Sequence, residues 1–178
     1  ISFYWLIIGS LGISITTFVA QNFGAKQYDR VRKSIKECLK LSIIFTVILS
    51  IVMYIFAPDI LSLFMKDTEI INLGVKYLRM LVPTLILYVG FEVISGSLRG
   101  IGDAIIPSLL SLFGICCIRV LWIRIVFSNN PTMENVVYCY PVTWIITTIL
   151  FVMYYLIFKP IKKKIEMEEN KNHENSFD

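Results

Sequence analysis

The stretch Gly100–Asp103 (GIGD) contains residue types that could do chemistry in two different kinds of site. A Gly-x-Gly-Asp sequence supplies one of the two carboxylates with which an intramembrane aspartyl protease activates water. Tyr28 followed by Asp29 matches the Tyr-Asp pair that would supply the other. A glycine-rich loop can also hold a phosphate group on its backbone N–H groups. The third interpretation is a turn between two helices, in which the glycines permit the chain to reverse.

Both chemical interpretations of GIGD lack the partners that they need. Asp29 lies in the most basic part of the chain, between Lys26 and Arg30, rather than in an apolar segment where two carboxylates could share a proton. No predicted strand precedes the loop, and no Lys-Ser or Lys-Thr pair follows it, as a phosphate loop requires. We therefore interpret GIGD as a turn, with the intramembrane aspartyl protease as a remote alternative. In this turn Arg99 marks the cytoplasmic end of one span and Asp103 caps the next.

Other catalytic and metal-binding patterns are missing from the sequence. The four cysteines have no metal-ligand spacing. The single histidine, His173, falls in the polar C-terminal tail, so the apolar part of the chain has no Ser/His or Cys/His arrangement. We therefore expect a protein that is not an enzyme, with no catalytic residue, no metal site and no cofactor.

The composition indicates a membrane protein. Hydrophobic residues make up 56% of the sequence and charged residues 17%, whereas about a quarter of a soluble domain is charged. The apolar residues form runs of the length that crosses a hydrocarbon core of about 30 Å. These runs have no polar face to offer water, which argues against a soluble helical bundle. We predict an all-α polytopic membrane protein with five transmembrane helices at about 1–23, 38–58, 77–98, 104–127 and 135–158.

Lysine and arginine residues predict the orientation of these helices. The connection 24–40 has six basic residues and the segment 159–164 has four, whereas 59–76 has two and 128–134 has none. Basic connections stay in the cytoplasm, so we place residues 24–40, residues 159–164 and the C-terminus there. Residues 159–178 are too poor in apolar side chains to fold alone, and we predict a disordered cytoplasmic tail. The basic residues lack the interleaved aromatic residues of a nucleic-acid platform, so we expect no nucleic-acid partner.

Two charged residues fall deep inside predicted spans. An ionisable side chain at such depth is costly and usually faces a cavity or a partner. At 1.5 Å of rise per residue, Glu92 lies roughly 9 Å and Arg119 about 21 Å from the inner edge, so a gap of about 12 Å argues against a direct pair. For Glu92 we consider a coupling or substrate role, with a structural hydrogen bond as the alternative. For Arg119 the structural role is preferred.

Three segments resemble the multidrug and toxic compound extrusion (MATE) transporters. SGSLRGIGDAIIP (95–107) resembles the stretch between the tenth and eleventh helices, FVAQNFGAKQYDRVRK (18–33) the loop after the eighth, and YPVTWIITTILFVMYY (140–155) the last helix. Their order and spacing match helices eight to twelve over residues 1–158. The resemblance implies a two-lobed transporter with six helices per lobe, of which this chain forms most of the C-terminal lobe. It also implies export of small organic cations or drugs across the plasma membrane in exchange for Na⁺ or H⁺.

The resemblance also bears on the site residues and partners. Some Na⁺-coupled members carry an aspartate at the position of Tyr88, whereas here Glu92 stands one turn further along the same face, so the coupling ion stays open. A lipid-linked oligosaccharide flippase of the same superfamily is the alternative. Cationic residues such as Arg119 in the cavity would favour a flippase, and Glu92 with aromatic residues would favour drug export. The implied partners are organic cations, the lipid bilayer and the N-terminal lobe of the same polypeptide.

Overall fold

The computed structural model describes residues 2–174, and this part of the chain is helical apart from short connections. Five helical segments are long and apolar enough to cross a membrane, which confirms the predicted all-α fold with five spans. The elements in chain order are α1 (Ser2–Gly24), α2 (Tyr28–Ile55), α3 (Ala57–Ser62), α4 (Thr68–Leu81), the 3₁₀ turn η1 (Val82–Thr84), α5 (Leu85–Gly100), α6 (Ile105–Ser111), the π-helical segment η2 (Leu112–Cys117), α7 (Ile118–Trp122), the π-helical segment η3 (Ile123–Phe127), α8 (Met133–Phe158) and α9 (Pro160–Glu174).

The third span is longer than the predicted 77–98, because α4, η1 and α5 form one continuous helical segment. Its start is set by Asp67, whose Oδ1 accepts hydrogen bonds from the backbone N–H groups of Glu69 at 2.9 Å and Ile70 at 3.4 Å. Such a cap satisfies N–H groups that have no partner in the first helical turn. Pro83, which has no N–H to donate, lies in η1 at the middle of this span.

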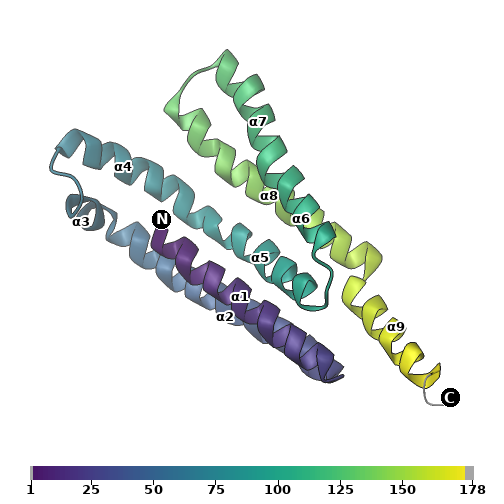
Figure 1. Cartoon of the computed structure of the whole chain (residues 1–178). Helices are drawn as coiled ribbons and strands as arrows, with labels where there is room; N and C mark the ends of the chain where they lie inside the picture. Colours follow the sequence, from purple (N-terminus) through teal and green to yellow (C-terminus); the bar gives the residue numbers. More distant parts are fainter. Residues whose placement is uncertain (1, 175–178) are drawn as a thin grey trace.

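Helix α5 lies at the centre of the packing. Helices α1 and α2 run side by side, and α5 contacts both of them (Figure 1). Helix α8 also contacts α5, and it pairs along its length with the span that runs from α6 to η3. A side chain of α5 can therefore meet residues of α1, α2 or α8.

Glycines allow α1 and α5 to approach closely. A Cβ atom at Gly96 would lie 2.8 Å from the carbonyl oxygen of Gly12. A Cβ atom at Gly100 would lie 2.7 Å from the Cβ of Val19. At the same contact the Thr16 hydroxyl lies 2.8 Å from the carbonyl oxygen of Gly12 and 3.0 Å from that of Gly96. Small residues and a bridging hydroxyl are a common way of joining helices in a membrane.

The outer faces of the helices remain apolar. Large hydrophobic side chains are exposed along α2, on α6 to η3 and on the second half of α8. Lipid tails, unlike water, accept such faces without penalty, so this pattern agrees with a membrane-spanning fold. The exposed side chains on α2 include Leu41, Ile44, Phe45, Ile48, Ile51 and Ile55.

The GIGD stretch forms the predicted turn, but its aspartate does not cap the next helix. Gly102 has a φ of +86°, which glycine adopts without strain. The residue before α6 is Ala104, and no side chain caps that helix. Asp103 instead accepts a hydrogen bond on Oδ2 from the Tyr154 hydroxyl of α8 at 2.9 Å. The prediction of a cap was therefore wrong, because the Asp103 carboxylate is hydrogen-bonded to a residue of another helix.

The prediction of a disordered tail was also wrong for residues 160–174, which form α9. Pro160 occupies the first position of this helix, where its missing N–H needs no partner. Ile161 and Ile165, one turn apart, are 4% and 1% exposed and join the hydrophobic core. The low average content of apolar residues in the tail gave no sign of these two buried positions. Residues 175–178 and the side chain of His173 lie outside the described residues.

Candidate functional site

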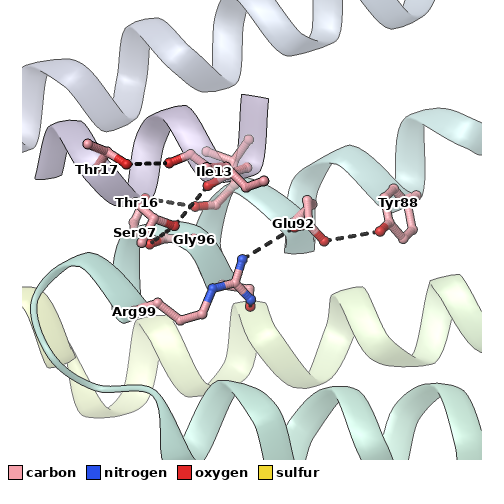
Figure 2. Close-up of polar contacts among 11 residues, drawn as sticks. Ile13, Thr16, Thr17, Tyr88, Glu92, Gly96, Ser97 and Arg99 are labelled. Carbon is pink, nitrogen blue, oxygen red and sulfur yellow. Dashed lines mark hydrogen bonds and ion pairs between the residues drawn. The ribbon is translucent and has the colours of Figure 1, made fainter. Parts of the chain in front are cut away.

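The Glu92 carboxylate lies at the centre of a polar group on α5 (Figure 2). Its side chain is 17% exposed. Tyr88, one turn earlier, donates its hydroxyl to Oε2 at 3.1 Å. Arg99, two turns later, places Nη2 at 3.4 Å from Oε1. These three residues follow a spacing of four and seven, which puts them on one face of the helix.

Arg99 does not serve only as a marker of the membrane edge. Its guanidinium also donates from Nη1 to the hydroxyl of Ser95 at 2.8 Å. We did not predict the pair of Arg99 with Glu92 from the sequence, because the only partner that we weighed for Glu92 was Arg119, on another helix. The spacing of Glu92, Ser95 and Arg99 along one helix face was the signal that could have identified it.

Helix α1 meets the carboxylate at Gly12. A Cβ atom at this position would lie 2.6 Å from Oε1 of Glu92 and 3.3 Å from its Cδ. Only a residue without a side chain leaves room for the carboxylate there. Figure 2 shows that the hydroxyl groups of Thr16 and Ser97 lie on the neighbouring part of the contact between α1 and α5.

An aromatic cluster adjoins the carboxylate. The Tyr88 ring is 4.3 Å from Trp5 of α1, 4.6 Å from Phe91 and 6.2 Å from Trp144 of α8, measured between ring centroids. Trp5 and Trp144 are also in contact, at 5.9 Å. Helices α1, α5 and α8 therefore supply the aromatic rings around Tyr88, the residue that donates a hydrogen bond to Glu92.

Arg119 contacts an aromatic ring of α8. Its guanidinium carbon is 4.4 Å from the centroid of the Tyr140 ring of α8. A cation over an aromatic face is stabilised by the ring quadrupole. Its Nε is buried and has no hydrogen-bond partner among the described residues. The Tyr140 ring is in turn 6.0 Å from the Trp144 ring, so Tyr140 connects Arg119 to the aromatic cluster.

The arrangement combines two features that attract cations. A carboxylate supplies charge and the aromatic rings supply faces that attract organic cations. Among the described residues, no group of three or more His, Cys, Asp or Glu side chains could hold a metal ion. The two aspartates of the protease interpretation have separate partners, since Asp29 is fully exposed beside Arg32 and Asp103 is bonded to Tyr154.

The chain is similar to a protein family and to a curated bacterial protein. The family model described as MatE matches residues 1–123. A curated relative named "Probable multidrug resistance protein YoeA", from Bacillus subtilis strain 168, is 30% identical over 148 residues. These residues make up 82% of this chain and 32% of the relative, so the chain spans about a third of the relative's length.

Two solved structures share the fold. One is the inward-facing conformation of a multidrug resistance MATE family transporter of the MOP superfamily, with a TM-score of 0.77 and 17% identity. The match covers 91% of this chain and 38% of that one. The other is a crystal structure of MATE in the bent conformation, with a TM-score of 0.76 and 23% identity, covering 85% of this chain and 34% of that one.

Proposed function

Since the chain belongs to the MatE family, we propose that it forms most of one six-helix lobe of a two-lobed antiporter in the plasma membrane. The antiporter exports small organic cations and drugs in exchange for Na⁺ or H⁺. The relative that is named a multidrug resistance protein supports drug export. The partial coverage of their chains supports a second lobe, which would complete the path for the substrate.

The observation that carries the proposal is the half-buried Glu92 beside the aromatic cluster. An ionisable side chain inside a span is costly and usually marks the path of an ion or a substrate, which favours a role of Glu92 in binding cations. If the coupling ion and the organic cation both bind this charge, they compete for it, and the entry of one drives the release of the other. Tyr88 and Trp5 lie where an organic cation could contact aromatic faces next to the charge.

The two alternatives are less well supported. A lipid-linked oligosaccharide flippase would line its path with cationic residues. Here the Arg119 guanidinium lies over the Tyr140 ring, and the Glu92 carboxylate lies next to the aromatic cluster. The named relative and the transporter of known structure are described as multidrug resistance proteins. Protease activity would need two carboxylates that share a proton, and Asp29 and Asp103 have different partners.

The test is Glu92→Gln in the full-length protein, reconstituted in proteoliposomes with ethidium as the organic cation. Glutamine keeps the shape and the hydrogen bond from Tyr88 but removes the charge. We expect normal insertion and loss of most Na⁺- or H⁺-driven efflux, with partial activity for Glu92→Asp. Glu69→Gln, an exposed position on α4, is the matched control and should transport normally. Near-normal efflux by Glu92→Gln at equal protein level would eliminate Glu92 as the coupling residue.

A further inference from the structure

Arg99 points away from the nearest membrane surface. It is the last residue but one of α5, so its Cα lies near the end of the span. An arginine at such a position usually extends toward the water at the near surface. Here its guanidinium reaches back to Ser95 and Glu92, and the Cα of Glu92 lies roughly 10 Å earlier along the helix axis. The side chain gives up part of its hydration, being 37% exposed, in exchange for these two contacts.

The two contacts differ in strength. The distance from Nη1 to the Ser95 hydroxyl is 2.8 Å, which is an ordinary hydrogen bond. The distance from Nη2 to the Glu92 carboxylate is 3.4 Å, whereas a charge-assisted bond measures about 2.7–2.9 Å. Ser95 is only 2% exposed, so it anchors the guanidinium in a fixed place. The ion pair is therefore the looser contact, and a small cation could displace it while the anchor at Ser95 stays intact.

No other charged group of the described residues faces Glu92 from the neighbouring helices. Helix α1 has no charged residue, and α8 has none after Glu134. The charged residues of α2 are all exposed, and Arg119 lies over Tyr140. On α5 itself the ionisable neighbours of Glu92 are Tyr88 and Arg99.

From this geometry we propose that Arg99 is a tethered counter-cation of Glu92, which occupies the carboxylate when no coupling ion or organic cation is bound. The inference rests on the proposed role of Glu92 as the coupling carboxylate. Arg99 neutralises the empty site, so that an unpaired carboxylate is never left inside the membrane. It also competes with the incoming cation, and so sets the concentration at which the site fills.

The experiment measures ethidium efflux by the full-length protein in proteoliposomes as a function of Na⁺ concentration and of pH. Arg99→Gln keeps a donor for Ser95 but removes the competing charge. We expect the Na⁺ or H⁺ concentration for half-maximal efflux to fall about tenfold, which corresponds to about 1.4 kcal/mol, with a smaller change in the maximal rate. Arg99→Lys keeps the charge and should restore the wild-type concentration dependence.

Two further variants separate competition from a loss of structure. Arg124→Gln removes an arginine from an exposed position of another span and should leave the half-maximal concentration unchanged. Ser95→Ala removes the anchor but not the charge, and should shift the half-maximal concentration in the same direction as Arg99→Gln. If Arg99→Gln does not insert into the membrane, Ser95→Ala tests whether Arg99 competes with the incoming cation.

The outcomes distinguish the inference from the proposed function. If Glu92→Gln is inactive while Arg99→Gln and Ser95→Ala keep the wild-type half-maximal concentration, Arg99 is no competitor and the proposed function stands. A lower maximal rate with unchanged half-maximal concentration would assign Arg99 a purely structural role and overturn the inference. If Glu92→Gln transports normally, the proposed function itself fails.

Discussion

Gly12→Ala adds one methyl group at the point where α1 meets the Glu92 carboxylate. The added Cβ would lie 2.6 Å from Oε1 of Glu92. Ordinary contact needs about 3.5 Å, so the oxygen must move by roughly 0.9 Å. Oε1 is 3.4 Å from Arg99 and Oε2 is 3.1 Å from Tyr88, so a movement of this size alters both contacts that hold the carboxylate.

The expected result is a loss of transport without a matching loss of stability. Alanine is better than glycine inside a helix by about 1 kcal/mol. Fitting an extra methyl group costs about 1–3 kcal/mol, and the low end applies because the end of a glutamate side chain can move. The two effects nearly cancel in the free energy of unfolding. Misplacing a functional group by about 1 Å can cost up to a hundredfold in activity, and we expect ion-driven efflux to fall about tenfold.

Gly9→Ala is the matched control on the same helix, because a Cβ atom at that position would lie within 4 Å of no described atom beyond its chain neighbours and the surrounding backbone of α1. Both variants of the full-length protein are compared by thermal unfolding in detergent and by ethidium efflux from proteoliposomes. Gly9→Ala should transport like the wild type. If Gly12→Ala also transports like the wild type, Glu92 does not act from its position against α1, and the reasoning from the site geometry is refuted.

Two further predictions concern the orientation and the tail. In a full-length variant without native cysteines, a cysteine at Asn129 should react with an impermeant thiol reagent from outside and one at Lys33 should not, because we predict that the basic connection 24–40 faces the cytoplasm; the reverse labelling would overturn the orientation. Ile165→Asn should release α9 and speed proteolysis of the tail, because Ile165 is 1% exposed, whereas Met167→Asn, at a residue 54% exposed, should not; equal proteolysis of the two variants would contradict docking of α9.

The features that the sequence predicted correctly depend on local patterns. The five spans follow from apolar runs long enough to cross a bilayer. The glycine turn follows from Gly102, because the conformation at its φ of +86° suits glycine in particular. Each of these features needs only neighbouring residues and the properties of the solvent, so no knowledge of the packing was required.

The features that could not be predicted from the sequence depend on partners that lie far away in the chain, or on single buried positions within a segment of polar average composition. Asp103 follows the rules for a helix cap but is bonded to Tyr154, which lies 51 residues later. The tail has a polar average, yet Ile161 and Ile165 lie one turn apart and are buried in the core. A rule based on local composition cannot distinguish these cases, because the free energy comes from contacts with other helices.

For the candidate site, the sequence by itself determined that Glu92 is unusual, because a carboxylate inside a span needs a partner wherever the neighbouring helices lie. Only the tertiary structure decided what surrounds it. The approach of α1 at Gly12 and the aromatic rings of α1 and α8 arise from helix packing, in which side chains of distant segments must fit together. Even the pair with Arg99, on the same helix, depends on that packing, because the direction an arginine takes is set by the water, lipid and protein around it.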